Sequence, residues 1–274
     1  MSPEGVAGIL RRMAPPPIAL TIAGSDSGGG AGIQADLKTF QHFHVFGTSV
    51  ITAVTAQNTR GVAGWAPVDT AMIDLQIDAL AVDLRPAALK TGMLGGAAVV
   101  ETVATAIRRH GLAPLVVDPV MVSASGHALL ESDAVDTVRE MLVPLAALVT
   151  PNLDEAEVLV GESVRDVDAM ERAGRSLVAR GAGAALIKGG HLVGDAAIDV
   201  LVHGNHVRVF THPRLGTQHT HGTGCTLSSA ITAHLATGAT LDDAVERSIE
   251  WVHRAIATAP GLGSGHGPLN HWAD

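Results

Sequence analysis

The chain has 274 residues, a formal net charge of −9 at pH 7 and 47% hydrophobic residues. This length fits one large α/β domain or two small ones, and the acidic balance argues against a nucleic-acid-binding protein, which usually carries a basic face. The single cysteine excludes an internal disulfide framework.

The first residues of the chain predict neither a leader peptide nor a folded element. Residues 1–17 contain two arginines and three consecutive prolines, with no long apolar run behind them. The uncharged stretch 39–59 contains too many Gln, His, Asn and Thr residues to cross a membrane. We therefore expect a cytoplasmic protein with a flexible extension over residues 1–17 and one domain over residues 18–274.

The first predicted strand, residues 18–23, runs into a glycine-rich loop, residues 24–32, and then into a helix. Residues 30–35 match the glycine pattern of dinucleotide-binding loops. However, no Asp or Glu occurs between Asp36 and Asp69, so the ribose-binding carboxylate of that motif is missing. The bare backbone at Gly24 instead favours a small ligand lying against the end of the first strand, with Asp36 pointing toward it.

Strands and helices alternate through the rest of the chain. Strands are predicted over residues 48–56, 62–68, 87–90, 114–117, 146–149, 184–188, 197–202 and 206–210, and helices over residues 69–83, 96–110, 133–142, 166–180, 224–236 and 241–258. The last two strands flank His203-Gly204-Asn205, a hairpin turn. The alternation predicts a mainly parallel sheet with helices on both faces.

Polar or glycine-containing segments follow most of these strands. They include Gln57, Asp118, Asn152 with Glu155, and Lys188. Because ligands bind outside the carboxyl ends of parallel strands, these side chains are expected at one edge. Asp118 and Glu155 would suit a Mg²⁺ ion held partly by water and phosphate. The simpler alternatives are a strand-end cap for Asp118 and, for Glu155, a capping box begun by Asn152.

A second glycine-rich turn, residues 220–227, leads directly into an apolar helical run. Gly222 and Gly224 allow a tight backbone, and the first helical N–H groups have no partner within the helix. Together with the helix dipole they predict a phosphate site, although a plain helix start capped by threonine is the alternative. Cys225 lies inside the turn, where a thiol is expected to ionise more readily than a free thiol of pKa about 8.5.

The usual nucleotide motifs are missing: the sequence contains neither a P-loop nor the protein-kinase motif set. In combination, however, several segments resemble the hydroxymethylpyrimidine/phosphomethylpyrimidine kinases of thiamine biosynthesis, within the ribokinase-like superfamily. The matching segments are residues 22–36, 55–59, 90–93, 118–121, 150–155, 188–191 and 220–227.

The resemblance implies a three-layer αβα ribokinase-like fold, usually a homodimer, with ATP and Mg²⁺ as cofactors. It implies two successive phosphoryl transfers onto a small molecule: first onto the 5-hydroxymethyl group of 4-amino-5-hydroxymethyl-2-methylpyrimidine, then onto the monophosphate. The main alternative is a pyridoxal or pyridoxine kinase of the same branch. A non-catalytic vitamin- or nucleotide-binding regulator is the alternative outside the enzymes.

The resemblance also implies roles for individual residues. Gln57 would bind the pyrimidine edge, Met93 and Val120 would sandwich the ring, and Gly24 and Asp36 would complete the pocket. The nucleotide and metal side would use Lys188, Asn152, Thr220, Asp118 and Glu155.

The backbone N–H groups of Gly222, Thr223, Gly224 and Cys225 would stabilise the transferring group. Cys225 stands where most ribokinase relatives have a catalytic Asp, and we expect its thiol to assist deprotonation without being indispensable. Simpler alternatives are a polar turn residue for Gln57, an ordinary core side chain for Met93 and a surface lysine for Lys188.

Overall fold

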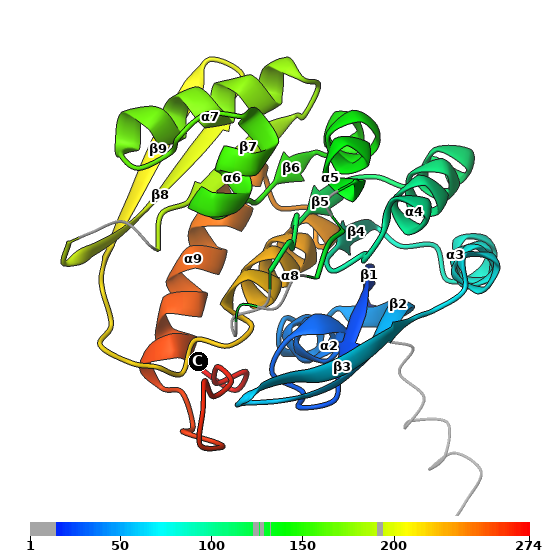
Figure 1. The fold of residues 1–274 in the computed structure, drawn as a ribbon, viewed down its shortest axis with the longest axis horizontal. Helices are drawn as coiled ribbons and strands as arrows, with labels where there is room; N and C mark the ends of the chain where they lie inside the picture. The colour runs from blue at the N-terminus through cyan, green and yellow to red at the C-terminus, as the bar shows by residue number, and fades with distance from the viewer. Residues whose placement is uncertain (1–14, 123–125, 127–128, 132, 191–193) are drawn as a thin grey trace, which may run out of the picture.

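The computed structural model describes residues 15–274 apart from 123–125, 127–128, 132 and 191–193. Within these residues the chain builds one central sheet in the order β3-β2-β1-β4-β5-β6-β7-β8-β9 (Figure 1). The strands are β1 (Ile18–Asp26), β2 (Phe46–Asn58), β3 (Gly61–Pro67), β4 (Ala88–Thr91), β5 (Leu115–Val117), β6 (Leu148–Val149), β7 (Ala184–Lys188), β8 (Ala196–His203) and β9 (His206–Pro213). The extension expected over residues 1–17 lies mostly outside the described residues and stays a prediction.

The sheet is parallel in its centre and antiparallel at both edges. β2, β1, β4, β5, β6 and β7 pair in parallel. β3 pairs antiparallel with β2, and β8 and β9 form an antiparallel hairpin beside β7. The mainly parallel sheet is therefore confirmed. Turns of two residues join β2 to β3 and β8 to β9, which allows antiparallel pairing, whereas parallel neighbours need a long crossover connection.

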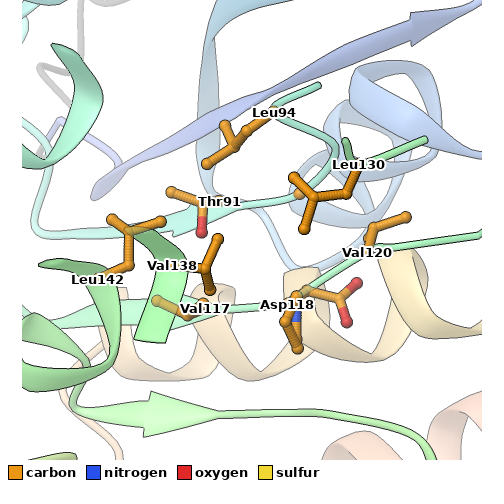
Figure 2. A pocket seen from close by; sticks show the side chains of 10 residues that line it. Thr91, Leu94, Val117, Asp118, Val120, Leu130, Val138 and Leu142 are labelled. Atoms are coloured by element: carbon orange, nitrogen blue, oxygen red, sulfur yellow. The ribbon is translucent and has the colours of Figure 1, made fainter. Parts of the chain in front are cut away.

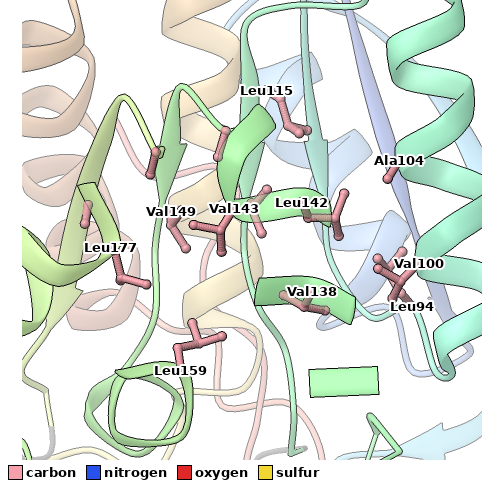
Figure 3. Packing of buried hydrophobic residues seen from close by; sticks show 14 of the residues in the cluster. Leu94, Val100, Ala104, Leu115, Val138, Leu142, Val143, Val149, Leu159 and Leu177 are labelled. Carbon is pink, nitrogen blue, oxygen red and sulfur yellow. The ribbon is translucent and has the colours of Figure 1, made fainter. Parts of the chain in front are cut away.

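Helices cover both faces of the sheet, which confirms the three-layer fold (Figure 1). One face carries α3 (Thr70–Asp83), α4 (Ala97–His110), α5 (Ala134–Thr137), α6 (Leu153–Val160) and α7 (Val167–Ala179), and the other carries α2 (Gly32–His42), α8 (Thr223–Ala236) and α9 (Leu241–Ala257). Figure 3 shows the larger apolar core, to which Val100, Leu115, Leu142 and Leu177 belong, between the sheet and the first group of helices. A second core packs α8 and α9 against the opposite face.

The helix predicted over residues 133–142 is shorter than expected. α5 ends at Thr137, and a π-helical turn (Val138–Leu142) and a 3₁₀ turn (Val143–Leu145) follow it. Pro144 lies in the 3₁₀ turn and has no backbone N–H to continue an α-helical ladder. A helix that the sequence analysis did not include, α6, begins immediately after Asn152.

In the described part of the chain, no helix combines the length and the apolar character that a membrane crossing requires.

The ends of the parallel strands position the site. The register between β1 and β2 shifts between Ala23, which pairs with Ile51, and Ser25, which pairs with Val54, so β2 carries one extra residue opposite Gly24. Such bulges redirect the backbone at the end of a strand.

Candidate active site

The two glycine-rich loops meet at the carboxyl edge of the sheet. Gly222 caps the N-terminus of α8 with a φ of 81°. A Cβ added at Gly222 would collide with the carbonyl oxygen of Gly30, in the loop after β1. Because φ is positive and the neighbouring backbone is so close, only glycine fits this position.

No side chain of the described residues caps the N-terminus of α8. The Thr223 hydroxyl instead donates to the carbonyl oxygen of Thr220 at 2.7 Å and stabilises the turn that precedes the helix. The Thr223 N–H also donates to the Thr220 carbonyl oxygen, at 3.2 Å, while the first-turn amides that follow have no side-chain cap, which is the arrangement that binds anions at helix N-termini. The helix begins at Thr223, one residue earlier than expected.

A lysine and a carboxylate lie directly beside this anion loop. Lys188 Nζ donates to Asp118 Oδ1 at 3.1 Å, and a Cβ added at Gly224 would lie 3.2 Å from that Nζ and 3.6 Å from Asp118 Oδ2. Asp118 also accepts from Thr150 at 3.2 Å and from Ser228 at 3.3 Å. The ends of β5 and β7 therefore converge with the start of α8.

Opposing effects set the charges of this pair. Burial alone would raise the pKa of Asp118, but the ammonium groups of Lys188 and Lys90 outweigh burial and hold that pKa below its usual value. Burial would lower the pKa of Lys188, yet Asp118 and Glu155 raise it overall. Both groups are therefore charged at neutral pH.

Glu155 takes part in a capping box and also lies beside the Lys188–Asp118 pair, although the sequence analysis treated the capping box and a metal-site role as alternatives. Its side chain accepts from the Asn152 N–H at 2.8 Å while Asn152 Oδ1 accepts from the Glu155 N–H at 2.9 Å, so the capping box of α6 is present. Burial raises the pKa of Glu155 to about 7; Lys188 opposes the rise and Asp118 adds to it. The carboxyl group is therefore close enough to interact with both charges of the neighbouring pair.

Asp118 and Glu155 fit a metal that takes few ligands from the protein. The described residues contain no group of three or more His, Cys, Asp or Glu side chains arranged to hold a metal ion. Two carboxylates beside a phosphate-binding loop match the way Mg²⁺ is usually bound, with waters and substrate phosphates completing an octahedron.

The thiol of Cys225 does not behave as expected. Burial raises the pKa of Cys225 to about 12; Lys90 opposes this rise, while Asp36 and Asp118 add to it. The expectation of an easily ionised thiol is therefore wrong, because burial and the nearby carboxylates outweigh Lys90 and the Gly32 backbone N–H, which both lower the pKa of Cys225. At neutral pH the thiol carries its proton.

Met93 and Val120 come together on the other side of the strand ends. Met93 is buried, Val120 is half-buried, and both belong to one small apolar cluster with Ala53 and Leu129. A Cβ added at Gly24 would lie 3.0 Å from the Met93 sulfur, so Gly24 brings bare backbone against this cluster. Figure 2 shows a pocket beside it, with Thr91, Asp118 and Val120 among the lining residues.

Asp36 has a different environment from the one expected. It is completely buried, and its carboxylate accepts from Thr21 and Ser229 at 2.6 Å and from Lys90 at 3.0 Å. Both carboxylate oxygens of Asp36 therefore accept hydrogen bonds from within the protein, and Asp36 does not complete an open substrate pocket. It joins α2 to β1, β4 and α8.

The sequence analysis missed two further polar residues of the site, Asp26 and His221. Asp26 accepts backbone N–H bonds from Gly28, Gly30 and Ala31, and its Oδ2 lies 3.0 Å from His221 Nε2. Burial would raise the pKa of Asp26, but the hydrogen bonds from His221 and the loop amides hold it below its usual value.

Gln57, near the end of β2, lies 3.2 Å from the same His221 nitrogen. The position of Asp26 directly ahead of a glycine run could have indicated that its side chain accepts hydrogen bonds from the loop amides. No local pattern predicts a partner 195 residues away.

The αβα fold and an anion loop that faces a lysine–aspartate pair define a ribokinase-like phosphotransferase. Residues 26–270 match the family model described as phosphomethylpyrimidine kinase. The chain belongs to this family and is a kinase.

Curated relatives of similar length carry the same name. A hydroxymethylpyrimidine/phosphomethylpyrimidine kinase of Bacillus subtilis is 50% identical over 256 residues, covering 93% of this chain and 94% of that protein. The Streptomyces coelicolor protein of that name is 49% identical and covers 94% and 96%. The thiamine biosynthesis bifunctional protein ThiED of Geobacter sulfurreducens is 46% identical and covers 97% of this chain and 55% of that protein.

Solved structures support the same fold. The ADP complex of Bacillus subtilis pyridoxal kinase superposes with a TM-score of 0.88 at 39% identity, covering 94% of this chain and 98% of that one. The phosphomethylpyrimidine kinase of Clostridium difficile superposes with a TM-score of 0.79 at 43% identity, covering 88% and 99%.

Proposed function

We propose that this kinase transfers phosphoryl groups from ATP to 4-amino-5-hydroxymethyl-2-methylpyrimidine, first forming the monophosphate and then the diphosphate for thiamine biosynthesis. The observation that carries the proposal is the position of the anion loop, between the Lys188–Asp118 pair on one side and Gln57 on the other. Phosphate-binding groups and a candidate ring-binding amide thus lie at one edge of the sheet.

Each side chain has a role that its environment supports. The amides of Gly222, Thr223, Gly224 and Cys225 would bind the transferring phosphoryl group, and loss of one such donor typically costs about 3 kcal/mol in the transition state. Lys188 would neutralise phosphate charge, and Asn152 and Thr220 would contact the nucleotide.

Asp118 and Glu155 would hold Mg²⁺, which when bound supplies positive charge to the phosphate oxygens. On the substrate side, Gln57 would bind the ring edge while Met93, Val120 and the bare backbone of Gly24 enclose the ring.

The protonated thiol of Cys225 is too weak an acceptor to act as a general base at neutral pH. Phosphoryl transfer depends mainly on positioning and charge stabilisation, so a strong base is not required. Cys225 would therefore act mainly through its backbone amide.

Mass spectrometry of the products from the pyrimidine, ATP and Mg²⁺ tests the proposal. One or two added phosphates are expected, and turnover of pyridoxal with none of the pyrimidine would assign the enzyme to the pyridoxal kinases. The names of the relatives at 49% and 50% identity favour the pyrimidine over pyridoxal. Tight binding of either ring without turnover would favour a regulator.

The homodimer and the cytoplasmic location stay predictions. Light scattering of the purified protein measures the first, and fractionation of cells tests the second.

A further inference from the structure

His221 lies between Asp26 and Gln57, with a single ring nitrogen near both. Its Nε2 is 3.0 Å from Asp26 Oδ2 and 3.2 Å from Gln57 Nε2. A carboxylate can only accept a hydrogen bond, whereas an amide nitrogen can only donate one. One nitrogen cannot donate to the first and accept from the second at the same time.

The charge of Asp26 decides which bond forms. Asp26 is 3% exposed and already accepts three backbone N–H bonds, from Gly28, Gly30 and Ala31. Such an environment keeps the carboxyl group ionised. Nε2 of His221 must therefore carry a hydrogen that points to Asp26, and it has no lone pair left for an N–H of Gln57.

A half-turn of the Gln57 amide satisfies every group in the cluster. The amide oxygen then faces His221 and shares the Nε2 hydrogen, while the amide nitrogen faces Thr55 Oγ1 at the 3.2 Å contact. The Thr55 hydroxyl gives its one hydrogen to the carbonyl oxygen of Ser25 at 2.9 Å, so its oxygen is free to accept. Amide oxygen and nitrogen are assigned from such networks.

We propose that His221, held by Asp26, is a positioning residue that fixes the orientation of the Gln57 amide and thereby selects the substrate's ring edge. This inference rests on the proposed function, in which Gln57 binds that edge. After its two internal bonds the amide keeps one oxygen lone pair and one N–H. A ring nitrogen beside an exocyclic amine complements this pair, whereas an edge without the amine leaves the oxygen unpartnered.

The imidazole is held rigidly enough for this role. A Cβ added at Gly30 would lie 2.6 Å from His221 Cδ2, so the first glycine-rich loop packs directly on the ring. The backbone N–H of His221 donates to the carbonyl oxygen of Gly267 at 3.1 Å, in the C-terminal tail. Since the loop packs on the ring and the tail holds the backbone of His221, the Gln57 amide has a fixed partner before any substrate arrives.

Substrate discrimination tests the proposal. The ratio of kcat/KM for the aminopyrimidine to kcat/KM for its analogue with hydrogen in place of the amino group is measured in wild type, His221→Leu and His221→Gln. We expect His221→Leu to lower this ratio about tenfold through KM for the aminopyrimidine, the size expected for one lost hydrogen bond, with KM for ATP unchanged. His221→Gln restores an N–H donor and most of the ratio.

His203→Leu, at the exposed end of β8, is the matched control and is expected to keep the wild-type ratio. A wild-type ratio in His221→Leu would overturn the proposal.

A second measurement needs no activity. The ¹⁵N spectrum of histidine-labelled wild-type protein, with the His221 signals assigned by their loss in His221→Gln, is expected to show a hydrogen on Nε2. A bare Nε2 would overturn the inference. If wild type phosphorylates neither ring, the proposed function fails, while this spectrum still decides whether the Asp26–His221–Gln57 arrangement exists.

Discussion

Lys188 contributes both to stability and to the phosphate site, because it neutralises the buried Asp118 and faces the anion loop. Asp118 is 2% exposed, so removing the lysine leaves a carboxylate without its ammonium partner. Breaking a buried pair in this way typically costs about 3–5 kcal/mol of stability. The same substitution would also remove positive charge from the phosphate site.

Lys188→Met is therefore expected to lower kcat/KM for ATP by about a hundredfold or more, a loss of the size of one transition-state donor, and to lower the urea midpoint of unfolding. Lys188→Arg keeps the charge and should retain more of both properties. Steady-state kinetics and urea titration of the three proteins measure these effects. Activity of Lys188→Met within about threefold of wild type would contradict the role.

Cys225 tests whether a thiolate takes part in the reaction. Because burial raises the pKa of Cys225 to about 12, the thiol stays protonated over the whole range in which the enzyme is assayed. A free thiol of pKa about 8.5 would ionise between roughly pH 7 and 9. We expect kcat to follow the same pH profile in wild type and Cys225→Ser over this range. A rising limb present in wild type and missing in Cys225→Ser would restore the thiol as a base.

His271 should make folding sensitive to acid. It is 6% exposed, contacts Thr226 Oγ1 at 3.3 Å, and burial lowers its pKa to about 4, with Lys38 and His42 lowering it further. Below the unfolded pKa of about 6.5, the His271 imidazole binds a proton in the unfolded chain but not in the folded chain. The contribution of His271 to stability is therefore complete above that value and is lost as pH falls toward 4.

Urea unfolding across this range, compared between wild type and His271→Gln, measures the effect. The variant should lose less stability on acidification than wild type, while His203→Gln at an exposed position should follow wild type. Parallel pH profiles for all three proteins would rule out His271 as the source.

At the scale of elements, the close packing of the two glycine-rich loops depends on Gly222. Gly238 is a matched control, because it has a φ of 85° against 81° for Gly222 but no atom within 4 Å of an added Cβ. We expect Gly238→Ala to cost about 1 kcal/mol from backbone strain and to leave activity near wild type. Gly222→Ala also meets the backbone of Gly30, so it should displace the loop and lower kcat by a factor of about a hundred or more.

Thermal unfolding and kinetics of the two variants distinguish strain from steric conflict. Equal activities would mean that the α8 N-terminus does not need its packing against the first loop.

Local patterns predicted elements better than they predicted environments. The capping box of Asn152 and Glu155 spans three residues, so the sequence alone was enough to identify it. The alternation of strands and helices likewise predicted the parallel sheet. The burial of Asp36 depends on contacts with Lys90 and Ser229, and the proton on Cys225 depends on burial beside Asp36 and Asp118; in both cases the partners lie far away in sequence. The Asp26–His221 contact was missed for the same reason.

At the scale of the whole molecule, β3 is an edge strand, and no other strand of the described residues pairs with its outer side. Trp65 is 37% exposed on this outermost strand, and Val54 on its neighbour β2 is 54% exposed. An uncovered, apolar edge strand is a ready pairing surface. The expected homodimer would cover it.

We therefore expect Ala66→Lys, on the exposed edge strand, to shift the protein toward monomer, because a charged side chain blunts edge pairing. Ala98→Lys, on the exposed face of α4, is the control and should keep the dimer. Light scattering after size-exclusion chromatography gives the masses. A monomeric wild type would refute the homodimer, and a dimeric Ala66→Lys would place the interface elsewhere.

The fully buried ion pair of Lys90 and Asp36 constrains how this sequence can diverge. Loss of the Lys90 charge leaves a buried carboxylate without its ammonium partner, and loss of the Asp36 carboxylate leaves the ammonium group and the hydroxyls of Thr21 and Ser229 without their acceptor. A substitution at any one of these four residues is therefore expected to be selected against unless the other three change with it. Across distant descendants the quartet should be inherited intact or exchanged as a block, even though its members are scattered over β1, α2, β4 and α8.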